Sequence, residues 1–167
     1  NEFKKVSIKN LVHLKGTYWK TKDKLEEDLT FITRFLAQFN QKSIPDTIKI
    51  NEFSEINDPN IHIQDGPLAC GVSHIRALIH GYQNFKDYTT VIEDDASITN
   101  TANIEKYLQY IPDDWDIVCF NAISRLASEG VGRPWYKFEH EWHSTHFYIV
   151  KNSSLEKIFA GLYPITD

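Results

Sequence analysis

A short apolar run that ends abruptly in three consecutive carboxylates is the feature that most limits what this chain can fold into. Tyr88-Thr89-Thr90-Val91-Ile92 is rich in β-branched residues and predicts a mostly buried strand, and Glu93-Asp94-Asp95 follows directly. We call these three carboxylates the acidic triplet. Because ligands of open α/β sheets bind beyond the carboxyl ends of the strands, we expect the triplet at the edge where such sheets bind their ligands.

Strand and helix patterns alternate along the rest of the chain. The predicted strands are Lys5–Leu11, Thr47–Ile50, Asp116–Phe120 and His146–Val150, and the predicted helices are Thr21–Phe39, Leu68–Tyr82 after Gly66-Pro67, Asn103–Ile111, and one that opens on a capping box at Ser153-Ser154-Leu155-Glu156 and ends near Gly161. This alternation predicts an α/β fold with a mostly parallel central sheet flanked by helices. No segment is typical of a linker, so we expect a single domain over residues 1–167, and the absence of Met allows for missing flanks.

Composition narrows the classes of function. The chain is 41% hydrophobic and 13% aromatic, enough for one substantial core. Its net charge is -5, whereas a nucleic-acid binder is expected to carry a basic surface. No apolar run approaches the roughly 18 residues that span a bilayer. We therefore expect a soluble, cytoplasmic domain with no nucleic-acid partner and no transmembrane segment, whose cysteines, Cys70 and Cys119, are buried and reduced.

The acidic triplet has two interpretations. Like charges so close together raise one another's pKa unless something offsets them, and a divalent cation offsets them best. Oxygen ligands of this kind favour Mg²⁺ or Mn²⁺, which also bind diphosphate oxygens and water. The other interpretation is a solvated acidic turn that caps the next segment.

The surroundings of the triplet resemble a known family. Gly66-Pro67-Leu68-Ala69-Cys70-Gly71-Val72-Ser73-His74, then a helix, then Val91-Ile92 and the triplet resemble glycosyltransferase family 25, which includes bacterial lipooligosaccharide galactosyltransferases and procollagen galactosyltransferases. Asp113–Val118, Tyr148–Phe159 and the ending Pro164-Ile165-Thr166-Asp167 are similar to later segments of that family. The resemblance covers roughly residues 66 to 167, and the first 65 residues only in outline.

The resemblance implies a GT-A-like nucleotide-binding fold and an inverting, metal-dependent glycosyltransferase. The donor would be UDP-galactose or a related UDP-sugar, and the acceptor a hydroxyl of a glycan, lipooligosaccharide or glycoprotein. The metal, Mn²⁺ or Mg²⁺, would be bound by Asp95 and Glu93. The residues implied for donor binding are Asn10, Leu11, Ser73, His74, Glu93 and Asp94.

Other roles and functions stay open at this point. An inverting transfer needs a general base, and the candidates are Asp167, Asp116 and His146. His140, His143 and His146 recur every third residue, which fits neither a helix face nor a strand face, so a zinc site is not favoured. The alternatives to a transferase are a catalytically inactive family member that binds carbohydrate or serves assembly, and a Mg²⁺-dependent phosphohydrolase.

Overall fold

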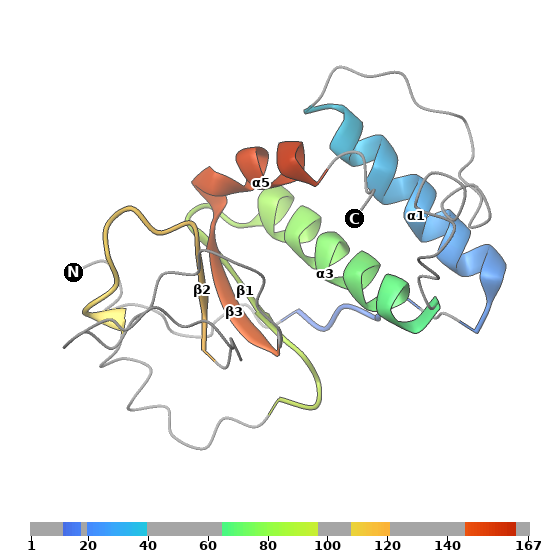
Figure 1. The fold of residues 1–167 in the computed structure, drawn as a ribbon, viewed down its shortest axis with the longest axis horizontal. Coiled ribbons are helices and arrows are strands. Elements are labelled where there is room, and N and C mark those ends of the chain that lie inside the picture. The colour runs from blue at the N-terminus through green and yellow to red at the C-terminus, as the bar shows by residue number, and fades with distance from the viewer. Residues whose placement is uncertain (1–11, 18–19, 40–64, 97–107, 121–145, 163–167) are drawn as a thin grey trace, which may run out of the picture. The chain divides into compact units, whose positions relative to one another are not determined.

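The computed structural model describes residues 12–17, 20–39, 65–96, 108–120 and 146–162 (Figure 1). The chain divides into two compact units. The sheet unit comprises Asn1–Val12 and Thr90–Lys151, and the helical unit comprises His13–Thr89 and Asn152–Asp167. The described part contains both helices and strands, which confirms the α/β class at that coarse level.

Helix α1 (Lys22–Ala37) opens the helical unit, within two residues of the predicted bounds. Thr21 is its N-cap residue, and the Thr21 carbonyl accepts the backbone N–H groups of Lys24 and Leu25. One face of the helix is fully buried, as its helical spacing of apolar residues predicted. The residues of that face with no exposed surface are Leu25, Leu29, Ile32 and Leu36.

Helices α3 (Asp65–Asn84) and α5 (Leu155–Gly161) complete the core of the helical unit (Figure 1). Four aromatic rings, two from α1 or just beyond its end and one each from α3 and α5, have centroids 5.3 to 6.1 Å apart. They are Phe35, Phe39, Tyr82 and Phe159. Several of these pairs have the edge-to-face geometry that aromatic rings prefer, so the cluster joins the three helices through contacts far apart in sequence.

The start of α5 corrects the predicted capping box. A short 3-10 helix, η2 (Asn152–Ser154), precedes α5, and the N-cap residue Ser154 makes no side-chain capping hydrogen bond. Glu156 instead accepts a 2.6 Å hydrogen bond from the Tyr82 hydroxyl, and this bond raises the pKa of Tyr82. The capping-box prediction was wrong because Glu156, which the box would have used, accepts its hydrogen bond from Tyr82 of α3.

The described strands form one three-stranded sheet in the order β1-β3-β2, where β1 is Tyr88–Ile92, β2 Ile117–Cys119 and β3 Phe147–Lys151. β2 and β3 are antiparallel, with Val118 opposite Ile149. β1 and β3 are antiparallel too, because Glu93 after the end of β1 donates to the carbonyl of His146 just before β3. Three successive residues of β3, Tyr148 to Val150, are buried, as befits a central strand.

The predicted mostly parallel sheet is therefore not found among the described strands. The prediction assumed that each connection returns the chain to a parallel neighbour, but the last strand enters between β1 and β2 and runs opposite to both. The predicted strands Lys5–Leu11 and Thr47–Ile50, and most of the predicted helix Asn103–Ile111, lie outside the described residues. The single-domain organisation stays a prediction.

Candidate functional site

The acidic triplet leaves the end of β1 in a tight turn. The backbone N–H of Ala96 donates to the carbonyl of Glu93 over 3.1 Å, so Asp94 and Asp95 occupy the two central positions of a four-residue turn. Glu93 is half-buried, whereas Asp94 and Asp95 are exposed. The turn folds the chain back on itself, and this brings the carboxylate of Asp95 to that of Glu93.

His146 lies opposite Glu93 across the antiparallel pair. The Glu93 N–H donates to the His146 carbonyl over 2.9 Å, and the Nε2 atom of His146 lies 3.9 Å from Oε2 of Glu93. Ligand atoms of Glu93, Asp95 and His146 all lie within 4.8 Å of one another. We call these three residues the carboxylate-imidazole cluster, and all three belong to the sheet unit.

The cluster fits a divalent cation. Metal bonds to oxygen and nitrogen are about 2.0 to 2.6 Å long, so two ligands of one ion are separated by about 5 Å or less. The cluster meets this limit, and two carboxylates and an imidazole are all common metal ligands. The side chains of His146 and Glu93 are 39% and 25% exposed, so a cation from solvent can reach them.

Ser73, predicted to bind the donor, uses its hydroxyl within the helical unit. The Ser73 hydroxyl donates to the carbonyl of Ala69 over 2.7 Å and accepts the backbone N–H of Thr17 over 2.8 Å. The bond from Thr17 attaches the end of segment 12–17 to α3, whereas the bond to Ala69 lies within the helix. The observed role of the hydroxyl is thus structural, and a contact with the donor stays a prediction.

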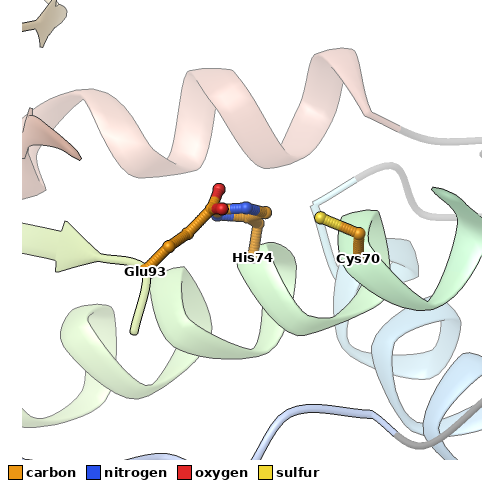
Figure 2. A group of neighbouring side chains, drawn as sticks. All are labelled: Cys70, His74 and Glu93. Carbon is orange, nitrogen blue, oxygen red and sulfur yellow. The ribbon is translucent and has the colours of Figure 1, made fainter. Parts of the chain in front are cut away.

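Cys70 and His74 project from the same side of α3, one helical turn apart (Figure 2). The Cys70 sulfur and a ring nitrogen of His74 lie within 4.8 Å of each other. Glu93, drawn in the same figure, belongs to the sheet unit, so the helical unit by itself provides two ligand atoms here. Two ligands on one helix face do not make a closed metal site.

The three candidates for the general base differ in what the structure says of them. His146 belongs to the carboxylate-imidazole cluster. Asp116 is half-buried just before β2, and its backbone carbonyl accepts the N–H of Lys151 over 3.1 Å. Asp167 lies outside the described residues, as do Asn10 and Leu11, and so do His140 and His143.

Sequence reasoning missed a buried ionic network in the helical unit. Asp28 is 5% exposed, and its Oδ2 atom accepts hydrogen bonds from the Thr17 hydroxyl at 2.8 Å and from Arg76 at 3.0 Å. Arg76 also donates to the Lys15 carbonyl at 3.4 Å, and Lys24 lies 3.2 Å from Oδ1 of Asp28. The sequence signal that could have revealed the network is Asp28, an aspartate beside leucines on the apolar face of the predicted helix Thr21–Phe39. The network gives segment 12–17 a second attachment.

The two cysteines differ in reactivity. Neither forms a disulfide; Cys70 is exposed, contrary to the expectation of burial, and Cys119 is partly covered. Burial raises the pKa of the Cys119 thiol to about 12. At pH 8 only roughly one Cys119 in ten thousand would be the reactive thiolate.

We expect a chromogenic disulfide reagent to label one thiol per folded chain rapidly, and Cys70→Ser to remove that fast phase while Cys119→Ser keeps it. Two thiols labelled at equal rates would contradict the structure.

Comparison with known proteins adds no relative. No family model, curated protein sequence or solved structure matches the chain. Within the described residues, no helix has the length and apolar character needed to cross a membrane.

Proposed function

We propose that this chain is a metal-dependent, inverting glycosyltransferase with a GT-A-like fold, which transfers galactose or a similar sugar from a UDP-sugar to a hydroxyl of a glycan, lipooligosaccharide or glycoprotein. The observation that carries the proposal is the carboxylate-imidazole cluster directly after β1. It involves the first and third residues of the same triplet on which the resemblance to glycosyltransferase family 25 rests. The mostly parallel sheet of the proposed fold would require strands outside the described residues.

The cluster suits the chemistry of a sugar nucleotide. Cleaving the bond between the sugar and the diphosphate builds negative charge on the leaving group, which a bound cation stabilises without a proton donor. Glu93 and Asp95 would hold that cation, since their carboxylates lie together. Asp94, exposed at the centre of the turn, would accept a hydrogen bond from a ribose hydroxyl or a metal-bound water.

The acceptor hydroxyl needs a base near the transferred sugar. Among the described residues, Asp116 and His146 are the two candidates, and both belong to the sheet unit, which also holds the triplet. Asp167 remains a third candidate from the sequence. The base would take the proton of the hydroxyl as the new glycosidic bond forms on the face opposite the departing diphosphate.

Calorimetric titration of the whole chain with UDP, with and without Mn²⁺, tests the proposal. We expect UDP binding that requires Mn²⁺, and we expect Asp95→Ala to weaken it at least about tenfold because one of two carboxylate ligands is lost. The matched control is Asp114→Ala, which removes an exposed carboxylate from a turn of the same unit and is expected to leave the affinity within about twofold.

Two other outcomes would point elsewhere. If the wild-type chain binds no nucleoside diphosphate in the presence of metal, the transferase proposal is wrong, and an inactive carbohydrate-binding member of the family becomes the better account. If a UDP-sugar is hydrolysed to UMP and sugar 1-phosphate without any acceptor-dependent product, the chain is a phosphohydrolase.

A further inference from the structure

A groove runs along one side of α1 in the helical unit. Its volume is about 740 Å³, and all but one of the residues that line it belong to α1 or its C-cap. These residues recur every three or four positions, so they form one continuous stripe on the surface of the helix. Within this lining the exposed or half-buried residues of α1 and its C-cap are Asp23, Glu27, Thr30, Phe31, Arg34 and Gln38, and we call these six residues the α1 stripe.

Phe31 lies at the centre of the α1 stripe and faces solvent. It is 48% exposed, and no other phenylalanine in the described part of the chain is as exposed. The opposite side of α1 is filled by residues with no exposed surface, such as Leu29 and Ile32, so the core of the helical unit does not account for Phe31. An aromatic ring left in water within a groove is typical of a residue that anchors a protein interface.

The charges of the α1 stripe are divided between its two ends. Asp23 and Glu27 lie toward the start of α1, and Arg34 and Gln38 lie toward its end. Glu27 already pairs with Lys24 at 2.9 Å, but both side chains are well exposed, so this pair is weak and leaves Glu27 able to bind a second cation. The stripe therefore carries carboxylates at one end, and a guanidinium and an amide that can donate hydrogen bonds at the other.

Such a stripe is complementary to an antiparallel copy of itself. Glu27 and Arg34 lie equally far from the centre of the stripe in opposite directions, and so do Asp23 and Gln38. In an antiparallel pair of α1 helices, Glu27 of each copy therefore faces Arg34 of the other, and the two Phe31 rings meet near the two-fold axis. A parallel pair would place like charges opposite each other, which is unfavourable. The pattern of charges thus selects the antiparallel arrangement.

We propose that the α1 stripe is the interface of a homodimer, in which two copies of this chain pair through antiparallel α1 helices. The proposal goes beyond the proposed function and does not rest on it, and every residue of the stripe belongs to the helical unit. From Asp23 to Gln38 the stripe extends about 22 Å along the helix, which suits a second helix better than a compact ligand. A single pair of helices buries a small interface, so we expect a dissociation constant weaker than about 1 μM.

Sedimentation velocity of the whole chain, at concentrations from about 1 to 500 μM, tests the proposal. We expect a monomer–dimer equilibrium, and we expect Phe31→Glu to weaken it at least about tenfold because the central ring of both copies is replaced by a charge. The matched control is Tyr110→Glu, which changes an aromatic residue of the sheet unit that is 58% exposed. It is expected to leave the dimer affinity within about twofold of wild type.

Exchange of charges tests the pairing of Glu27 with Arg34. We expect Glu27→Arg and Arg34→Glu each to dimerise at least about fivefold more weakly than wild type, because like charges then face each other twice in the symmetric interface. An equimolar mixture of the two variants restores opposite charges at both contacts. The mixture is therefore expected to form a heterodimer with an affinity within about threefold of the wild-type dimer.

Cross-linking tests the direction of the two helices. Thr30 lies beside the centre of the α1 stripe, so Thr30→Cys in a Cys70→Ser chain is expected to form a disulfide between two copies under mild oxidation. Gln38→Cys in the same background is the matched control. In the antiparallel pair each Gln38 lies about 22 Å from its own copy, too far for a disulfide.

The outcomes decide the proposal without nucleotide. A wild-type chain that stays monomeric at about 500 μM overturns it, and so does a dimer that Phe31→Glu leaves unchanged. Cross-linking through Gln38→Cys alone, as efficient as through Thr30→Cys, indicates parallel helices and also overturns it. If Phe31→Glu does not fold, the mixture of charge variants and the cross-links still decide. Because UDP takes no part, a failed dimer leaves the transferase proposal standing, and failed UDP binding leaves the dimer standing.

Discussion

Gly81→Ala is expected to lower the free energy of unfolding by about 3 kcal/mol, because the new methyl group has no space. Gly81 lies in α3 of the helical unit, and a Cβ atom there would overlap the Thr89 hydroxyl and lie 2.7 Å from the Thr89 Cβ atom. Thr89 is 2% exposed, and its hydroxyl donates a 2.6 Å hydrogen bond to Asn152. The threonine cannot rotate away without losing that bond, so the backbones must separate.

A glycine on the same helix provides the control. Gly71 has nothing within 4 Å of a built Cβ atom, so Gly71→Ala meets no obstacle and is expected to stabilise the chain by about 0.5 to 1 kcal/mol through helix propensity. Urea unfolding of both variants measures the difference. Gly81→Ala/Thr89→Gly is expected to lose less stability than the two single variants added together, because it removes the side chain with which the alanine collides. If Gly81→Ala and Gly71→Ala had the same stability, the close approach at Gly81 would be contradicted.

The helices could be predicted from the sequence because their signals are local. The spacing of Leu25, Leu29, Ile32 and Leu36 defines the buried face of α1, and Gly66-Pro67 marks the first turn of α3. The close approach on α3 could not be located the same way. The run of small residues Ala69-Cys70-Gly71 would by itself predict a near neighbour, but Cys70 and Gly71 are exposed and the tight contact is at Gly81. Which glycine faces a neighbour depends on a strand that packs against the helix.

The direction of a strand depends on pairing between distant segments. The prediction of a mostly parallel sheet was therefore wrong for the described strands. The same point applies to His146. In a mostly parallel sheet, the far end of the strand that His146 begins would lie beside the triplet. In the antiparallel pair it is the start of β3 that meets the end of β1, and this places His146 itself at the triplet. The sequence identified the acidic half of the cluster, and the sheet supplies the imidazole.

Asn152→Ala is expected to destabilise the chain by about 3 kcal/mol, since it removes the three hydrogen bonds that one buried side chain makes. The side-chain amide of Asn152 donates to the carbonyls of Gly81 at 3.1 Å and Phe85 at 2.7 Å, and its oxygen accepts the hydroxyl of Thr89. Asn152 is 8% exposed, so water cannot easily replace these bonds. One side chain therefore joins the last turn of α3 to the start of β1 within the helical unit.

Two further variants separate lost hydrogen bonds from lost volume. Asn152→Asp keeps the acceptor for Thr89 but replaces two N–H donors with a carboxylate that faces two carbonyl oxygens, so at pH 7 we expect it to be at least as destabilising as alanine. Asn84→Ala removes an exposed amide that donates to the His80 carbonyl at 2.8 Å, and its cost is expected to stay below about 0.5 kcal/mol. Urea unfolding measures stability, and amide exchange of the Asn152 N–H, which donates to the Asp87 carbonyl over 3.0 Å, reports the local opening. An Asn152→Ala variant as stable as Asn84→Ala would show that these buried bonds do not hold the two segments together.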